Sequence, residues 1–222
     1  VKAAQSSIRT SGRFSVALSG GSTPLPLYDL LASKADRTGI DWTKAHFFWG
    51  DERCVAADDP DSNFHQADVH LLSRLDIPPQ NIHRIPGEAG AAQAADFYEQ
   101  DLRKFFGSFP RFDLILLGMG PDGHTASLFP GSTALSESQR WVVGVPHSTP
   151  PPPLVDRVSL TLPVLNEAKK VIIMVAGAEK SVIMKQILEP DSKAELLPVQ
   201  RVMPHIGKVT WLIEKSALGK QP

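Results

Sequence analysis

Short runs of apolar residues recur along the chain and predict β-strands separated by helical stretches. The runs span Phe14–Ser19, His46–Asp51, Asp113–Gly118, Trp141–Val145, Arg157–Leu162, Lys170–Ala176 and Lys208–Ile213. Within two of them, at Leu114–Leu117 and Val171–Val175, every side chain is apolar. Strands that are apolar on both faces are typical of a parallel sheet buried between helices.

The stretches between these strands carry apolar residues at helical spacing. One stripe joins Leu25, Tyr28, Leu31 and Ala32, a second joins Phe64, Ala67, Leu71, Leu72 and Leu75, and a third joins Val182, Ile183, Ile187 and Leu188. A longer helix is predicted from Ala91 to Phe106, closed by Gly107. The alternation predicts an α/β fold with a mainly parallel sheet flanked by helices on both faces. Ligands of such sheets bind outside the carboxyl ends of the strands.

Composition and charge narrow the class of protein. The 222 residues are 42% hydrophobic and carry a formal net charge of -1, which predicts a globular chain without a nucleic-acid or anionic-membrane partner. The longest apolar stretch, Val171–Ala178, is too short for a membrane span of about 20 residues. The single cysteine, Cys54, excludes an internal disulfide and favours a reducing, cytoplasmic location. Grouped His and Cys ligands are absent from the sequence, so no metal is required.

A glycine-rich loop follows the first predicted strand. Ser19, Gly20, Gly21, Ser22 and Thr23 lead into a helix whose first turn holds two prolines. Glycines let the backbone approach a ligand, and the free N–H groups of a helix N-terminus favour an anion such as phosphate. The alternative is an ordinary turn in which a Ser or Thr side chain caps the helix.

Two acids and an arginine, Asp51, Glu52 and Arg53, stand at the carboxyl end of the second predicted strand. Asp51 and Arg53 could position a polar ligand, because the guanidinium group offers a planar fork to carboxylate, phosphate or hydroxyl groups. The alternative is a solvated turn whose charges pair with each other. Cys54 beside Arg53 is either an activated nucleophile or a small buried filler.

The third predicted strand leads into a turn that holds a candidate base. Gly118, Gly120 and Gly123 match G-x-G-x-x-G, but Pro130-Gly131 leaves no room for the long helix of a dinucleotide site. The Asp122-Gly123-His124 triplet is more informative, because a carboxylate in a tight turn can orient an imidazole that acts as a base at neutral pH. The alternative is a structural His124 that caps a following short helix.

The remaining candidates are single residues. Arg157 opens a strand and is either a ligand for an anion or a surface cation, and Lys180 lies at a strand-to-helix junction where it can complete an anion site. His205 is predicted to be a turn residue. The run Pro150–Pro153 is interpreted as a stiff connection between two strands, with a ligand for an SH3-type domain as the alternative.

Together these segments resemble the 6-phosphogluconolactonases of the glucosamine-6-phosphate isomerase/6-phosphogluconolactonase family. The resemblance rests on residues 19–24, 51–53, 118–130, 157–163 and 177–189, and extends over nearly the whole chain from Gly12 onward. The run from Gly118 to Pro130 is specific, whereas the glycine loop is shared with glucosamine-6-phosphate deaminases. The N-terminal strand and helix that the family normally carries are not recognised here, so we expect a trimmed N-terminus.

The resemblance implies a single domain over residues 1–222 and hydrolysis of 6-phosphoglucono-δ-lactone to 6-phosphogluconate, the second step of the oxidative pentose phosphate pathway. No cofactor is implied, the partner is the small sugar-phosphate lactone, and we expect a monomer or a weak homodimer. The implied site roles are as follows: His124 is the base with Asp122 beside it, Asp51 and Arg53 line the sugar ring and the carbonyl end, and Ser19, Gly20, Gly21, Ser22, Thr23, Arg157 and Lys180 hold the phosphate. Ser148 and Thr149 stand where family members often have a lysine before the prolines.

Two rival functions remain. A sugar-phosphate deaminase or isomerase would carry an acid five positions after the histidine, where this chain has Phe129. A non-catalytic sugar-phosphate sensor would be joined to a DNA-binding segment, and no basic helix-turn-helix pattern is seen in the sequence.

Overall fold

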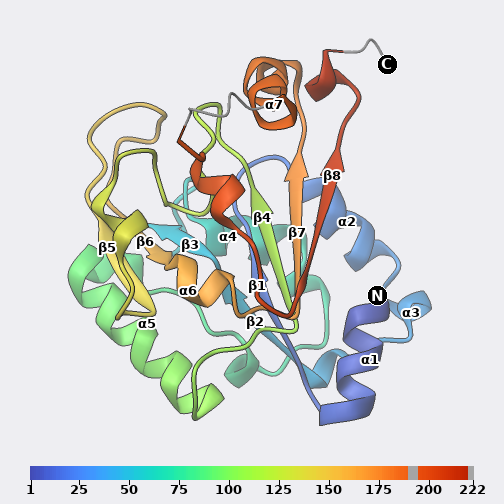
Figure 1. The fold of residues 1–222 in the computed structure, drawn as a ribbon. Coiled ribbons are helices and arrows are strands. Elements are labelled where there is room, and N and C mark those ends of the chain that lie inside the picture. Colours follow the sequence, from blue (N-terminus) through green and yellow to red (C-terminus); the bar gives the residue numbers. More distant parts are fainter. Residues whose placement is uncertain (190–194, 220–222) are drawn as a thin grey trace.

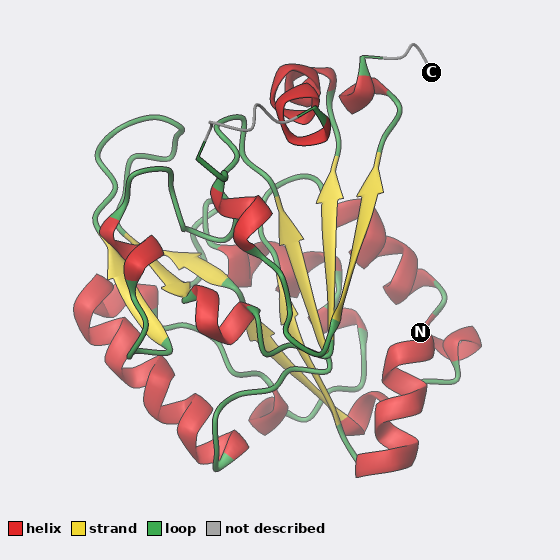
Figure 2. Ribbon diagram, viewed as in Figure 1, coloured by secondary structure: helices red, strands yellow, loops and turns green. Residues whose placement is uncertain are grey.

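The computed structural model describes residues 1–189 and 195–219 and has a five-stranded sheet at its centre (Figures 1 and 2). The strands lie in the order β2-β1-β4-β7-β8, and every neighbouring pair runs parallel. They are β1 (Phe14–Leu18), β2 (Ala45–Trp49), β4 (Leu114–Gly118), β7 (Lys170–Val175) and β8 (Lys208–Ile213). The predicted α/β fold with a mainly parallel sheet is confirmed. The predicted single domain also takes in residues 190–194 and 220–222, which lie outside the described residues, and it stays a prediction.

Two predicted strands form a separate sheet, which corrects the expectation of one sheet. β5 (Val142–Val145) and β6 (Arg157–Leu160) pair antiparallel, and β6 also pairs antiparallel with β3 (Asp51–Arg53). The sequence analysis ends its second strand at Asp51 and does not recognise that Asp51–Arg53 form a strand of their own. The reason is Gly50, whose N–H donates to Leu18 O in the main sheet at 2.9 Å while its carbonyl accepts from Leu160 N in the second sheet at 2.8 Å.

The helices pack around both sheets. They are α1 (Lys2–Ser11), α2 (Leu25–Ser33), α3 (Ala35–Thr38), α4 (Asn63–His70), α5 (Ala91–Phe106), α6 (Leu162–Leu165) and α7 (Ser181–Leu188). α5 has the predicted bounds, whereas α1 is a helix that the sequence analysis does not recognise. The stripe predicted for α4 runs past the end of the helix, and the stripe predicted for α7 is partly wrong because Val182 and Leu188 are exposed.

Burial follows the position of each strand in the sheet. All five residues of β1 are buried, as its central place predicts, whereas exposed and half-buried residues alternate along β8 at the sheet edge. In the described ranges, 1–189 and 195–219, no helix has the length and apolar character that crossing a membrane would demand.

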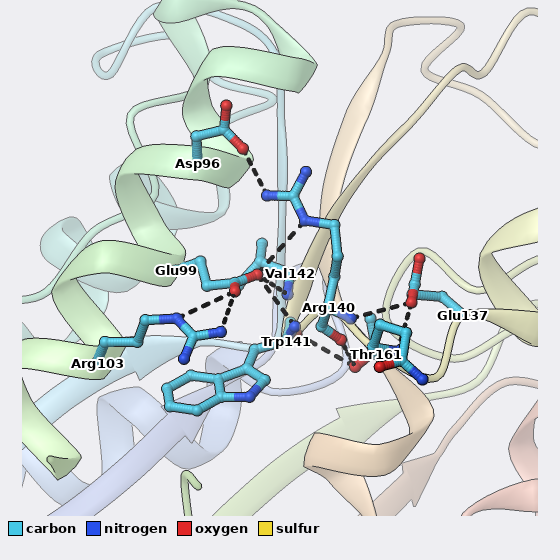
Figure 3. Close-up of polar contacts among 9 residues, drawn as sticks. Asp96, Glu99, Arg103, Glu137, Arg140, Trp141, Val142 and Thr161 are labelled. Atoms are coloured by element: carbon cyan, nitrogen blue, oxygen red, sulfur yellow. Dashed lines mark hydrogen bonds and ion pairs between the residues drawn. The ribbon is translucent and has the colours of Figure 1, made fainter. Parts of the chain in front are cut away.

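A polar network fixes the second sheet to α5 (Figure 3). The Glu99 carboxylate accepts hydrogen bonds from the N–H groups of Trp141 at 3.1 Å and Val142 at 3.2 Å, and from Arg103 at 2.7 Å. Arg140 lies 3.5 Å from the same carboxylate. Burial acts to raise the pKa of Glu99, but these hydrogen bonds prevail and lower the pKa below its usual range. The network therefore anchors the start of β5, and with it the sheet that carries Asp51, Arg53 and Arg157.

Candidate active site

A cleft of about 620 Å³ opens at the carboxyl ends of β1, β4 and β7, beside the second sheet. The predicted site residues that line it are Ser19, Gly20, Gly21, Ser22, Thr23, Asp51, Arg53, His124, Arg157 and Lys180. Asp122 is not among the residues that line the cleft, but its carboxylate contacts the His124 ring. The structure thus brings together segments that are far apart in the sequence, at the edge of the sheet where ligands of α/β folds bind.

The glycine loop leaves the N-terminus of α2 open toward the cleft. Tyr28 fixes the start of the loop, because its hydroxyl accepts from Ser19 N at 3.1 Å and donates to Ser19 O at 2.7 Å. Gly21 N–H donates to Gln66 Oε1 at 3.0 Å, so this amide already has a partner. In the described part of the chain no side chain caps α2, which argues against the capped-turn alternative. The N-terminal N–H groups of α2 therefore remain available to an anion.

Gly20 is required at its position by a close neighbour. A Cβ atom there would overlap the amide oxygen of Asn63, a residue that is 1% exposed. The Asn63 Nδ2 group donates to Asp51 O at 2.8 Å, which prevents the amide from moving aside. Asn63 also lines the cleft, and the sequence analysis does not single it out. The sequence signal for Asn63 was weak, because this residue only precedes the predicted helical stripe that begins at Phe64.

His124 and Asp122 form a hydrogen-bonded pair. His124 Nδ1 lies 2.6 Å from Asp122 Oδ1, which also accepts from His124 N at 3.1 Å. The ring packs against Gly120, where a Cβ atom would overlap it. Burial raises the pKa of Asp122, but the hydrogen bond from the His124 ring, the charge of that ring and the backbone hydrogen bonds together outweigh burial and lower the pKa. A charged Asp122 assigns the Nδ1 proton to this bond, which leaves Nε2 as the basic nitrogen.

The turn after His124 does not begin an α-helix, so the helix-capping alternative is wrong. Ala126 instead adopts a positive φ of 47°, a conformation that is uncommon for a residue with a side chain. The next residue, Ser127, is fully buried and its hydroxyl donates to Asp51 Oδ2 at 2.7 Å. This turn therefore links the His124 segment to the second sheet.

Asp51 and Arg53 project toward the cleft from alternate positions of β3. They do not pair with each other, so the self-paired alternative is wrong: Asp51 is held by Ser127, and Arg53 Nη1 donates to Asp61 O at 2.5 Å. Glu52 lies between them, and its carboxylate accepts from Asn63 N at 2.7 Å. Side chains alternate across a strand, so this acid supports α4 while its neighbours face the cleft.

Cys54 is not an activated nucleophile. Burial, followed by the nearby carboxylates of Asp156 and Glu52, raises the pKa of its thiol to about 11. The thiol therefore stays protonated at neutral pH, and the interpretation as a packing residue holds.

Two arginines meet at the junction of β3 and β6. Arg53 and Arg157 are direct cross-strand partners, and Arg157 is 5% exposed. Within residues 1–189 and 195–219, neither guanidinium has a carboxylate within ion-pair distance. Burial, followed by the charge of Arg53, lowers the pKa of Arg157. Two adjacent cations without a protein counter-ion favour an anionic ligand.

Lys180 completes the cationic side of the cleft just before α7. Its Nζ lies 4.0 Å from Glu179 Oε1, and its side chain is 15% exposed. Glu179 and Glu214 also line the cleft, and the sequence analysis does not identify them. Pro151 and Pro152 form another part of the wall, a role that the sequence analysis does not assign to the proline run.

Comparison with known proteins gives one consistent result. A family model described as glucosamine-6-phosphate isomerases/6-phosphogluconolactonase matches residues 1–211. A 6-phosphogluconolactonase from Synechocystis sp. is 43% identical over 216 residues, covering 95% of this chain and 85% of that protein. The structure of 6-phosphogluconolactonase from Trypanosoma cruzi superposes with a TM-score of 0.87 at 34% identity, covering 98% of this chain and 88% of the other. The 6-phosphogluconolactonase from Thermotoga maritima gives a TM-score of 0.81 at 32% identity, with coverage of 96% and 90%.

Proposed function

The chain belongs to the glucosamine-6-phosphate isomerase/6-phosphogluconolactonase family, and we propose that it hydrolyses 6-phosphogluconolactone to 6-phosphogluconate with His124 as the base. The reaction is the lactonase step of the pentose phosphate pathway. The observation that carries this proposal is the His124–Asp122 pair, separated by 2.6 Å, in a cleft that also holds two arginines with no ion pair among the described residues.

The base acts through its free nitrogen. Asp122 holds the Nδ1 proton, so Nε2 of His124 takes a proton from a water molecule as that water attacks the lactone carbonyl carbon. The attack forms a C–O bond, and collapse of the tetrahedral intermediate breaks the ring C–O bond. The ring oxygen leaves as a hydroxyl group after it receives the proton that His124 Nε2 took from the water, and the new carboxylic acid group releases its proton to solvent. A general base of this kind contributes about 10²–10⁴-fold, and fixing the substrate in place adds to that.

The phosphate is held away from the reacting carbon. The N-terminus of α2 with Ser19, Gly20, Gly21, Ser22 and Thr23 offers N–H and hydroxyl donors, and Arg157 and Lys180 supply positive charge. Asp51 and Arg53 line the sugar ring and the carbonyl end. Ser127 and Asn63 fix the Asp51 carboxylate, so that its position does not depend on the substrate.

The nearest rival chemistry needs a second proton-transfer group beside the histidine. Phe129 lies there instead, with its ring centroid 4.6 Å from that of His124. A phenyl ring cannot transfer protons, which supports hydrolysis over isomerisation or deamination. A monomeric or weakly dimeric state, a cytoplasmic location and independence from cofactors stay predictions.

The proposal is tested with freshly prepared 6-phosphogluconolactone and a pH indicator, with glucosamine 6-phosphate in a parallel reaction. We expect acid release from the lactone above the spontaneous rate and no reaction with the amino sugar. His124→Ala should lower kcat about 10²–10⁴-fold while binding of 6-phosphogluconate persists. Full activity of this variant would remove His124 from the mechanism, and turnover of glucosamine 6-phosphate alone would replace the proposed function.

A further inference from the structure

The proline loop between β5 and β6 forms a wall of the cleft, but prolines cannot secure it by their own backbone. Pro151 and Pro152 line the cleft. Proline lacks an N–H group, so the run Pro150–Pro153 offers carbonyl acceptors and no amide donors. The wall must therefore be held by donors from elsewhere in the molecule.

Two side chains supply those donors. His147 Nε2 lies 2.7 Å from Pro151 O, and the ring nitrogen donates because a carbonyl only accepts. Arg157 Nη2 donates to Pro153 O at 2.7 Å, and its Nε donates to Val155 O at 3.0 Å. The same guanidinium that faces the cleft is thus fixed by the loop, so the position of the wall and that of the phosphate-binding cation depend on each other.

His147 is also connected to the base. Its ring stacks on Phe129 with centroids 4.3 Å apart and planes at 15°, and the ring of Phe129 lies 4.6 Å from that of His124. Phe129 therefore lies between the two imidazoles. Asp122 fixes one edge of the His124 ring, and Phe129 limits its rotation from another side. His147 is only 6% exposed, so it cannot leave this stack without opening the loop.

We propose that His147 is a positioning residue of this enzyme with two separable roles, holding the proline wall through Pro151 and supporting His124 through Phe129. The inference rests on the proposed lactonase function for its kinetic readout. The donor role acts on substrate binding, because Pro151, Pro152 and Arg157 line the cleft in which we propose that the sugar phosphate binds. The stacking role acts on turnover, because it orients the base.

Two substitutions separate these roles. His147→Phe keeps a ring against Phe129 but loses the donor, and we expect KM to rise about three- to tenfold with kcat within twofold, as for the loss of one hydrogen bond. His147→Gln keeps an N–H donor near the position of Nε2 but loses the ring, and we expect kcat to fall about three- to tenfold with KM within twofold. His205, exposed in a turn, provides matched controls as His205→Phe and His205→Gln.

Two further measurements, the kcat of Phe129 variants and the binding of 6-phosphogluconate, test the two roles of His147 independently. Phe129→Leu should reproduce the kcat loss of His147→Gln, and the double variant should lose no more than either single one, because both changes break the same stack. Binding of 6-phosphogluconate, measured by calorimetry, should weaken in His147→Phe whether or not turnover is assayed.

The outcomes separate the two proposals. Wild-type kcat, KM and product binding in both His147 variants would overturn the positioning role. The positioning role would also be overturned if both His147 variants lost equally in kcat and KM together with a lowered melting temperature. Losses in kcat that add up in the double variant would overturn it as well. A wild-type protein that fails to release acid from the lactone would instead refute the proposed function, while the calorimetric result still decides whether His147 holds the wall.

Discussion

Replacing Asp122 by Asn tests how the base is oriented. Asp122 Oδ1 accepts two hydrogen bonds from one residue, from His124 Nδ1 at 2.6 Å and from His124 N at 3.1 Å. An asparagine keeps the shape, but it removes the charge that fixes the proton on Nδ1. The amide can also present its NH₂ group, which would favour a proton on Nε2 and so block the base.

The magnitude follows from the kind of bond that is lost. A hydrogen bond to a charged group contributes about 1.5–3 kcal/mol, and each 1.4 kcal/mol corresponds to a factor of about ten. Because the bond orients the base and does not touch the phosphate, the loss should fall on kcat. We therefore expect Asp122→Asn to lower kcat about 10–100-fold and to leave KM within threefold.

The assay follows acid release from 6-phosphogluconolactone with a pH indicator, after subtraction of spontaneous hydrolysis measured without enzyme. Asp76→Asn is the matched control, since Asp76 is exposed and far from this pair in the sequence. Circular dichroism of both variants checks that the fold persists. A kcat for Asp122→Asn within threefold of wild type would refute the orienting role, and a loss confined to KM would assign Asp122 to substrate binding.

Three further predictions concern the phosphate site, the glycine loop and the anchor of the second sheet. Arg157→Ala and Lys180→Ala should each raise KM at least about tenfold with a smaller change in kcat, because a charge-assisted contact to phosphate is lost; unchanged KM in both would refute the phosphate assignment. Gly20→Ala should destabilise the protein by about 1–3 kcal/mol in urea unfolding and lower activity, because its methyl group overlaps the pinned amide of Asn63; wild-type stability and activity would show that the amide moves aside. Glu99→Gln should cost about 2 kcal/mol at pH 7. The pKa of Glu99 is lowered in the folded state, so its contribution is present above the unfolded-state pKa and is lost as pH falls through the folded pKa. The difference between wild type and variant should thus shrink toward pH 3, and equal differences at both pH values in denaturant titrations would contradict this.

Several elements could be predicted because their signals are local. The runs of β1, β4 and β7 and the stripe of α5 follow from the alternation and spacing of apolar residues, and α5 ends at Gly107 as predicted. The Asp122-Gly123-His124 turn could be predicted for the same reason, because the carboxylate and the imidazole that pair in it are two residues apart. Such features depend on near neighbours in the chain.

Other features were missed because they depend on contacts between distant segments. β3 has only three residues, and it becomes a strand by pairing with β6 about a hundred positions away. Asn63 and Ser127 carry no motif, and their roles arise only where both approach Asp51. The proline run contributes to the cleft because β5 and β6 place it there.

The sequence by itself determined the alternation of strands and helices, the turn that joins an imidazole to a carboxylate, and a chain without an excess of positive charge. Each of these depends on residue type and short spacing. Only the tertiary structure decided that the strands divide into two sheets, and that Arg53 and Arg157 are cross-strand partners without a counter-ion in the part of the chain that the structure describes. It also decided that His147 reaches the cleft wall. The physical reason is that hydrogen bonding between strands and the burial of charged groups depend on which distant segments are in contact. The local pattern of residues does not specify these contacts.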